Sequence, residues 1–493
     1  MALSRRSLLA GGALAAGGAL AGCGYLGELG AVASASHSGP RPPVQWEQAA
    51  DKTRRTLGRL TYGPRPEELA EAEALGLTGW IETQLAPAQL DDRDCELRLQ
   101  RLDTPFMDLS LLNELRPENI GPDLRAATLL RAIYSRRQLY ELMVEFWSDH
   151  FSVSIEKERV APLKVIDDRE VIRPHALGSF AELLWAAMGS PAMLIYLDNQ
   201  RNHAASPNEN YARELLELHT LGVGAGYTQR DVREAARCLT GWSVDEEGLW
   251  RGQQRFEPAQ HDGGVKELLG QVLPAGGGAH DVERLHGLLL AHPATPRFIA
   301  AKLVRRFVAD EPPPALIERA AEAFRRSNGA ILAVLRAVLL APELAIAPPK
   351  FKRPLQLVAG ALRQLGAASD GGAPVQAALA AMGQPLFAWP TPDGFPDRSS
   401  AWSGSLLPRW QFAIRLASGE LEGTQLDLAG LIAASGAATM GAWLQRLSGL
   451  LWDAPLPPPV AARLIAALGQ ELTSERAALG LASMLAAPQY QWR

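Results

Sequence analysis

The sequence predicts a mainly α-helical fold: a large multi-helix domain with a short β-hairpin insertion near residues 243–272. Alanine and leucine dominate the 493-residue chain, and apolar residues recur at helical spacing over most of it. Alternating runs of Val, Ile, Thr and Tyr, which are typical of strands, are scarce. The composition, with 47% hydrophobic residues, is ample for a large buried core.

The first 35 residues are typical of a targeting segment rather than of the folded domain. The stretch SRRSLL, from Ser4, matches a twin-arginine export signal, and a Gly/Ala-rich apolar stretch follows it. The LAGC sequence that ends at Cys23 matches a bacterial lipobox, which predicts lipidation of Cys23 and a membrane anchor. Cleavage after Ala35 is the alternative and would give a soluble periplasmic protein. We therefore expect export by the twin-arginine pathway to the periplasm or the outer membrane.

Residues 36–49 are expected to form a Pro-containing tether, residues 50–420 the helical domain, and residues 421–493 C-terminal helices packed on that domain. A Gly-rich, aromatic-spaced sequence from Trp242 to Pro274 interrupts the helical pattern and indicates the hairpin. The remaining elements expected in chain order are helices at 50–90, a pair at 120–150, a pair at 168–200, helices at 206–222, 228–241 and 281–346, a loop at 383–404, and helices at 405–493.

Residues 206–222, SPNENYARELLELHTLG, contain a strong helix start. Ser206 fits the N-cap, Pro207 the first helical position and Glu209 the third, which together would form a capping box. Gly222 or Gly224 provides the stop, because glycine accepts the left-handed backbone that ends many helices.

One face of this helix is polar, since Asn210, Arg213, Glu214 and Glu217 recur at helical spacing. Three interpretations remain open: a solvated face, a buried network in which Arg213 bridges carboxylates, or a metal or catalytic site. Exposed helix faces usually contain lysine, and this segment has none. Because the whole chain is poor in lysine, this argues only weakly against a solvated face. His219 is expected on the opposite side, which excludes a zinc-protease helix.

Other polar groups are candidates for function. His150 ends the stretch EFWSDHF, where it could ligate a metal, act as a base, or interact with a helix dipole. His203 lies in the loop before the polar helix. His261, Asp262 and Lys266 belong to HDGGVK, which is typical of a turn but also suits a polar ligand site.

Several classes of protein are disfavoured. The net charge is −5 and the basic residues are dispersed, which argues against nucleic-acid binding. The chain has no phosphate-loop, dinucleotide-binding or GxSxG signature. Cys95 and Cys238 could form a disulfide or remain buried free thiols, and spacing does not decide between these.

Several segments resemble, in order, an exported bacterial family known as domain of unknown function 1800. The segments are LTYGP (60–64), FWSDHF (146–151), PAMLIYLD (191–198), NENYARELLELHTLG (208–222), LTGW (239–242), HD (261–262), Lys266 and the stretch 383–409. One departure is Phe395 after Gly394, where the family more usually has Gly-Trp. The resemblance implies a mostly helical fold, export and no assigned reaction. It also suggests a companion exported protein similar to alkaline-phosphatase-type hydrolases.

The leading hypothesis is an exported α-helical protein of unknown activity, tethered to the outer membrane, whose motif residues form a polar pocket between helices. If the protein is an enzyme, we expect metal-assisted or general acid–base hydrolysis of a cell-envelope or extracellular polymer. Glu214, Glu217 and His150 would be bases or ligands of a divalent metal, and Arg213 an electrostatic clamp. Substrate-binding candidates are Asn210, His203, His261, Asp262 and Lys266. The alternative is a non-catalytic assembly or binding protein that works with the companion hydrolase-like protein.

Overall fold

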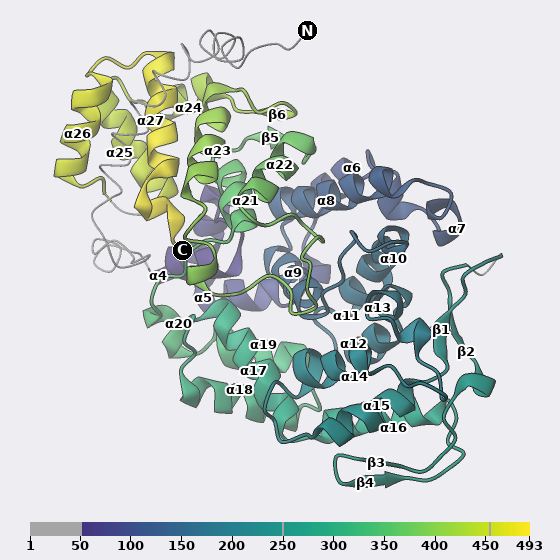
Figure 1. Ribbon diagram of the computed structural model, residues 1–493. Coiled ribbons are helices and arrows are strands. Elements are labelled where there is room, and N and C mark those ends of the chain that lie inside the picture. Colours follow the sequence, from purple (N-terminus) through teal and green to yellow (C-terminus); the bar gives the residue numbers. More distant parts are fainter. Residues whose placement is uncertain (1–51, 249–250, 453–454) are drawn as a thin grey trace, which may run out of the picture.

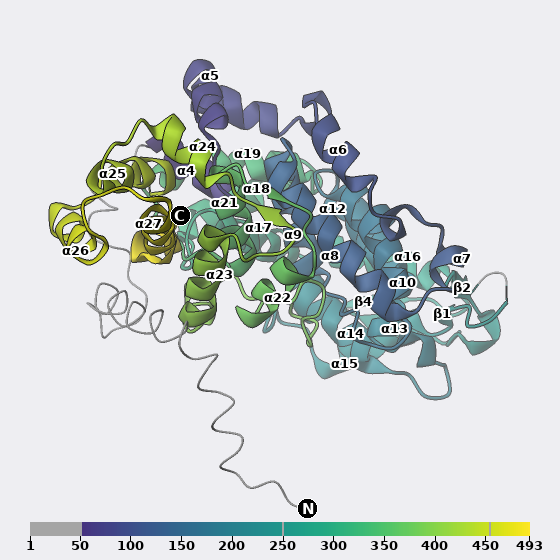
Figure 2. The same ribbon diagram turned by 90° about the horizontal axis from the view of Figure 1, so that it is seen from above.

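Helices form almost all of the regular structure in the computed structural model, which describes residues 52–248, 251–452 and 455–493 (Figures 1 and 2). The mainly α-helical fold is therefore confirmed. The predicted targeting segment with Cys23 and the 36–49 tether lie outside the described residues, so export and lipidation stay predictions. Among the described helices, none is both long and apolar enough to cross a membrane.

The N-terminal third is a set of helices around the long pair α8 and α9. The elements are α4 (Lys52–Leu60), α5 (Pro66–Gln84), η1 (Pro87–Gln89), α6 (Arg93–Leu99), η2 (Thr104–Phe106), α7 (Leu109–Leu112), α8 (Pro117–Tyr134) and α9 (Gln138–His150). Proline begins both α5 and α8, where the missing N–H costs no hydrogen bond. The predicted pair at 120–150 is confirmed, with its break at residues 135–137.

The next segment contains two π-helical stretches within otherwise α-helical runs. Its elements are α10 (Val160–Ile166), η3 (Asp167–Ile172), α11 (Arg173–His175), α12 (Phe180–Gly189), α13 (Pro191–Tyr196), η4 (Asn199–Arg201), α14 (Glu209–Glu214), η5 (Leu215–Thr220) and α15 (Gln229–Leu239). The π-helices are η3 and η5. Such wide turns are rare and occur often at functional sites.

Two β-hairpins, rather than the one predicted, follow α15. Strand β1 (Trp242–Val244) pairs antiparallel with β2 (Gln254–Phe256), and, after η6 (Pro258–Gln260), β3 (Lys266–Leu268) pairs with β4 (Gln271–Leu273). The second turn is Leu269-Gly270, and both residues have positive φ angles, as a type I′ turn requires. The sequence placed strand structure in the right region but did not separate the two turns.

The second half of the chain is again helical. It comprises α16 (His280–Ala291), α17 (Ala294–Phe307), α18 (Pro314–Arg326), α19 (Ile331–Leu339), α20 (Pro342–Ile346), α21 (Pro354–Gln364), β5 (Ala368–Ser369), α22 (Ala373–Ala381), η7 (Ser399–Ala401), α23 (Leu406–Ser418), β6 (Thr424–Gln425), α24 (Leu428–Ser435), α25 (Met440–Leu451), α26 (Pro458–Leu468), α27 (Ser474–Ala486) and η8 (Pro488–Gln491). The β5–β6 pair was not predicted, because a two-residue strand has no sequence periodicity.

A single large hydrophobic cluster extends through the described chain from Leu57 to Tyr490. The C-terminal helices α24–α27 lie at the end of the molecule opposite the hairpins, and both views show this (Figures 1 and 2). Every residue of α21 is buried, so this helix is part of the central core. Arg493 donates to the carbonyl of Arg59 in α4, so the two ends of the described chain are in contact.

Candidate functional site

A cavity of about 210 Å³ lies where α9, α17 and the loop between α22 and α23 meet. We call it the Lys302 cleft. It is lined by Phe146, Asp149, His150, Lys302, Arg305, Arg353, Asp393, Phe395, Pro396, Asp397 and Arg398. Two of the segments that carry the family resemblance, FWSDHF and the stretch 383–409, therefore line the same cleft. Lys302 comes from α17, for which the sequence analysis identified no candidate.

Gly394 brings the loop into direct contact with the end of α9. Its φ of +71° is in the left-handed region, and a Cβ atom there would overlap the carbonyl oxygen of Asp149. Only glycine combines this backbone angle with so close an approach. The neighbouring Phe395 then lies in the cleft wall, so the departure from Gly-Trp keeps an aromatic ring there.

His150 is fully enclosed, and both of its ring nitrogens contact protein atoms. Its Nε2 lies 3.0 Å from the carbonyl oxygen of His219, and its Nδ1 lies 2.8 Å from Lys302 Nζ. Because a carbonyl only accepts, Nε2 carries the proton. Burial, and then the nearby Lys302 and His219, hold the pKa of His150 well below 6.5, so the ring is neutral and Nδ1 accepts from Lys302.

The π-helix η5 explains why the His219 carbonyl is available. The last carbonyls of a helix lack intrahelical donors, and the His219 carbonyl lies at this end of η5. The His219 side chain is also buried, and burial lowers its pKa to about 3. Its Nε2 has no hydrogen-bond partner in the structure. His219 therefore acts on the cleft through its backbone.

Lys302, which is half-buried, differs from three of the four buried lysines in the described part of the chain. Lys164, Lys266 and Lys350 each have an aspartate oxygen within 2.6–2.7 Å of the Nζ atom. No carboxylate lies within ion-pair distance of Lys302 Nζ in the described part of the chain. Burial lowers the pKa of Lys302 to about 8, although Asp149, Asp397 and Asp393 oppose the change. The amine is therefore still mostly protonated at pH 7, but it loses its proton at a much lower pH than an exposed lysine does.

A buried network of arginines and carboxylates supports the cleft from behind. Glu145 accepts from Arg306 Nη2 at 2.6 Å and from the Tyr62 hydroxyl at 3.0 Å. Arg353 Nη2 donates to Asp149 at 2.6 Å. Burial alone would lower the pKa of Arg353, but Asp149 and Glu145 outweigh it and raise the pKa. The end of α9 is thus fixed by hydrogen bonds between charged groups, which are stronger than hydrogen bonds between neutral groups.

The predicted start of the polar helix was wrong by two residues. Asn208, not Ser206, is the N-cap, and its side chain accepts from the backbone N–H of Asn210. The reason is tertiary: Asn202 Oδ1 accepts from the Asn208 N–H and fixes the chain outside the helix there. Glu209 consequently makes no capping box. The predicted stop is confirmed, because Gly222 has a φ of +89°.

The polar face is a network at the surface, not a buried one. Arg213 donates to Glu209 at 3.2 Å and to Glu217 at 3.4 Å, and also to Gln229 at 2.9 Å. The Arg213 side chain is 37% exposed and that of Glu217 is 23% exposed. The predicted bridging role of Arg213 is present in this geometry. Neither Arg213 nor Glu217 lines the Lys302 cleft.

The other two residues of the polar face, Asn210 and Glu214, are not bonded to Arg213. Asn210 is exposed and donates from Nδ2 to the carbonyl of Leu197. Glu214 is half-buried, and burial, followed by repulsion from Glu217, raises its pKa. Asp393, which lines the cleft, also raises the pKa of Glu214, so Glu214 lies near the loop that carries Asp393.

The predicted metal site is not assembled from its three residues. Over the described ranges, no three His, Cys, Asp or Glu side chains gather closely enough to hold a metal ion. His150 has both nitrogens engaged by His219 and Lys302, and Glu217 is bonded to Arg213. Glu214, Glu217 and His150 therefore do not form a common ligand set.

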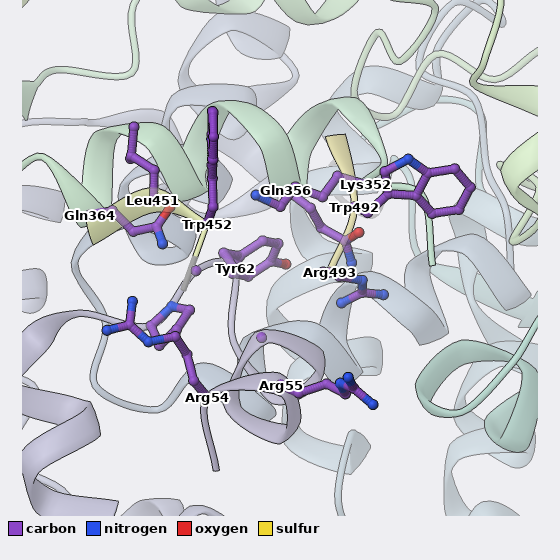
Figure 3. A pocket seen from close by; sticks show the side chains of 13 residues that line it. Arg54, Arg55, Tyr62, Lys352, Gln356, Gln364, Leu451, Trp452, Trp492 and Arg493 are labelled. Carbon is purple, nitrogen blue, oxygen red and sulfur yellow. The ribbon is translucent and has the colours of Figure 1, made fainter. Parts of the chain in front are cut away.

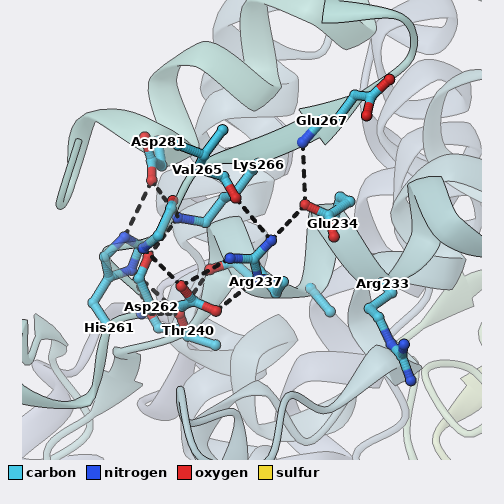
Figure 4. A network of polar contacts seen from close by, with 12 residues as sticks. Arg233, Glu234, Arg237, Thr240, His261, Asp262, Val265, Lys266, Glu267 and Asp281 are labelled. Atoms are coloured by element: carbon cyan, nitrogen blue, oxygen red, sulfur yellow. Dashed lines mark hydrogen bonds and ion pairs between the residues drawn. The ribbon is translucent and has the colours of Figure 1, made fainter. Parts of the chain in front are cut away.

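His261, Asp262 and Lys266 meet in a network that holds the hairpin loop on α15 and α16 (Figure 4). Arg237 binds Asp262 through two hydrogen bonds of 2.7 and 3.0 Å. Lys266 Nζ and His261 Nε2 both contact Asp281, at 2.7 and 3.3 Å. All the charges in this cluster are paired, which is typical of a structural network.

The remaining candidates, His203 and the two cysteines, lie outside the Lys302 cleft. His203 is half-buried and forms an isolated antiparallel bridge with Ser206, outside the cleft. Cys95 and Cys238 are both buried free thiols, so they do not pair. Burial raises the pKa of each thiol to about 12, which keeps both unreactive.

The match to a family profile covers residues 55–492, and the profile is described as protein of unknown function (DUF1800). The chain belongs to this family. Comparison with curated proteins and with solved structures gave no match. The family of domain of unknown function 1800 thus accounts for nearly the whole chain and confirms the predicted resemblance. It assigns no reaction, so function has to be argued from the cleft.

Lys302 was not predicted as a site residue because its immediate surroundings, RFIAAKLVRRF, have the pattern of an ordinary amphipathic helix. Ile299, Ala300, Leu303 and Val304 form the buried face, and Lys302 lies beside it. The available signal was composition: the chain has only seven lysines among 49 basic residues. A lysine next to the apolar face of a helix was therefore unusual in this protein.

Proposed function

We propose that this protein is an exported general acid–base hydrolase that acts on a cell-envelope or extracellular polymer, with Lys302 as the base. The observation that carries the proposal is the state of Lys302. Its amine lies at a cleft and is hydrogen-bonded to a neutral histidine, no described carboxylate forms an ion pair with it, and its pKa is lowered to about 8. General bases work best when the pKa is close to the working pH.

The hydrogen bond with His150 orients Lys302 without neutralising its basicity. A neutral Lys302 amine still has an N–H that donates to His150 Nδ1, and its lone pair then remains available to the cleft. His150 cannot replace Lys302 as the base, because its Nδ1 accepts from Lys302 and its Nε2 proton is donated to the His219 carbonyl. We therefore assign His150 as a positioning residue, not as the base or ligand that the sequence suggested.

The chemical step that fits is a base-assisted hydrolysis. Neutral Lys302 takes a proton from a water molecule, the hydroxide attacks the electrophilic atom of the scissile bond, and the bond to the leaving group breaks. The lysine ammonium then returns the proton to the leaving group. Arg305 and Arg398 line the same cleft and provide positive charge for an oxyanion that develops during the attack.

The lining suggests a polar substrate. Asp393 and Asp397 lie in the cleft together with the arginines, so both hydrogen-bond donors and acceptors are offered to a ligand. A cleft of about 210 Å³ accommodates one end or one unit of a polymer rather than a long segment. The polymer itself is proposed from the predicted export, which would place the protein among envelope and extracellular polymers.

The test is hydrolysis of envelope polymers by the mature protein. We expect release of new end groups at a rate that rises with pH through about 8, as the base loses its proton. Lys302→Met should lower kcat by at least about 100-fold, the usual contribution of a general base. Lys52→Met, which changes an exposed lysine outside the cleft, is the matched control and should keep full activity. Equal activity of both variants would reject Lys302 as the base.

A non-catalytic assembly protein that works with a companion hydrolase-like protein is the second candidate. The observation in its favour is the polar helix, whose charges satisfy one another at a partly exposed surface instead of lining the cleft. Under this proposal Arg213→Ala should weaken co-purification of the companion, while Lys302→Met should not. Fractionation of cells that produce Cys23→Ser tests the lipid anchor separately, since loss of the lipid should release the protein from the membrane.

A further inference from the structure

A second, smaller cavity of about 40 Å³ lies between α4, the Tyr62–Pro64 turn, the start of α21 and the last two residues of the chain (Figure 3). This volume can hold a group larger than one water molecule. It shares no lining residue with the Lys302 cleft. The cavity also involves the LTYGP segment, to which the proposed hydrolase mechanism gives no role.

Two basic side chains at this cavity are buried and form no ion pair with any described residue. Lys352 is 7% exposed and Arg493 is 4% exposed. Lys352 Nζ lies 3.5 Å from the centre of the Tyr490 ring, and no carboxylate lies within ion-pair distance of either side chain in the described part of the chain. Burial, and then repulsion from Arg493 and Arg409, hold the pKa of Lys352 well below 10.5. Isolated buried charge is costly, so a bound anion would stabilise this arrangement.

The cavity also contains buried donors that have no acceptor. Gln356 is 1% exposed; its Oε1 accepts from the Arg353 N–H, but its Nε2 has no partner. Arg493 Nη1 donates to the Arg59 carbonyl at 3.3 Å, but its Nε has no acceptor. Unsatisfied buried donors are rare in folded proteins, and here an amide and a guanidinium with such donors line one cavity together with the amine of Lys352.

We propose that this cavity is a binding site for a small oxyanion, a phosphate or carboxylate group, held by Lys352, Gln356 and Arg493. The unpartnered donors supply hydrogen bonds and the two cations supply the charge that such a group requires. The aromatic walls, Tyr62, Trp452 and Trp492, exclude water from the group and so strengthen the attraction. The site is separate from the hydrolytic cleft and does not depend on the proposed activity.

Thermal unfolding in different anions tests the site. The full mature chain is melted in sodium phosphate, sodium acetate and sodium chloride at equal ionic strength. A ligand at about 100 times its Kd should raise the Tm of a protein of this size by about 3 °C. The expected result is a rise in phosphate or acetate relative to chloride. Phosphate alone assigns the site to phosphate groups, and acetate alone to carboxylates.

Two variants show whether the rise comes from this cavity. Lys352→Met and Gln356→Leu should each abolish most of the rise, whereas Lys52→Met should keep it. In chloride, Lys352→Met should be at least as stable as the natural protein, because a buried amine without an ion-pair partner has been removed. The inference is overturned if neither anion raises the Tm of the natural protein, or if Lys352→Met keeps the full rise. A loss of hydrolysis in Lys302→Met does not affect either outcome.

Discussion

Replacing Lys302 with methionine should stabilise the fold at neutral pH, although it removes a hydrogen bond. A pKa that falls from 10.5 to about 8 means that the charged amine costs about 3 kcal/mol in the folded protein. The hydrogen bond to His150 offsets about 1–2 kcal/mol of this cost. Methionine retains most of the packing volume. The net expectation is a gain of about 1–2 kcal/mol in the free energy of unfolding at pH 7.

The gain should fade as the pH rises. Below pH 8 the amine is protonated in both states, so the folded protein bears the full cost of the charge. Between pH 8 and 10.5 only the unfolded state holds the proton, and the stability of the natural protein therefore increases with pH. From pH 7 to 9.5 the difference between the variant and the natural protein should shrink by about 2 kcal/mol.

Urea unfolding of both proteins at pH 7, 8, 9 and 9.5 measures this difference, because other titrating groups contribute equally to both. Lys164→Met is the control, because this variant should change the free energy of unfolding in the opposite direction. Lys164 is paired with Asp167 at 2.6 Å, and its removal would leave a buried carboxylate and cost about 3–5 kcal/mol. A Lys302→Met difference that does not change with pH would refute the lowered pKa, and with it the reason for assigning Lys302 as the base.

Three further predictions follow from the same geometry. Gly394→Ala should lower the free energy of unfolding by about 2–4 kcal/mol, since it adds both backbone strain and an overlap with Asp149, and an unchanged thermal midpoint would contradict this. Glu145→Gln should cost about 3 kcal/mol in urea unfolding, because Arg306 loses its closest counter-charge; a cost near zero would mean that the buried pair contributes little. Neither described cysteine should react with a thiol reagent at pH 8 until the protein unfolds, and rapid labelling of the native protein would show that their burial is overestimated.

Local patterns predicted most of the helices, because these depend on local signals. The α8–α9 pair, the stop at Gly222 and the loop at 383–404 all follow from apolar spacing, glycine and proline. Where a distant residue competed with a local signal, the prediction failed. Ser206 and Glu209 had the local pattern of a capping box, but the side chain of Asn202 bonds to Asn208 and moves the helix start.

The π-helix η5 limited what could be inferred about the polar face. Arguments from helical spacing assume 3.6 residues per turn, whereas each hydrogen bond in η5 spans five residues, as from Leu221 to Leu216. His219 was correctly separated from Glu214 as a ligand. Its actual role, a backbone carbonyl presented to His150, could not be predicted, because carbonyl availability depends on how the helix ends in three dimensions.

The distribution of lysine connects the two proposed sites. Arginine supplies most of the buried positive charge in this protein, as in the Glu145 network, and its always-charged guanidinium suits permanent ion pairs. A buried lysine loses its proton more readily than an arginine does. A buried lysine without a carboxylate partner therefore suits a site where the amine transfers a proton or binds an anion. Among the described residues, half-buried Lys302 and buried Lys352 form no ion pair, and each lines a cavity. The first has a pKa suited to proton transfer, and the second lies among unsatisfied donors suited to an anion.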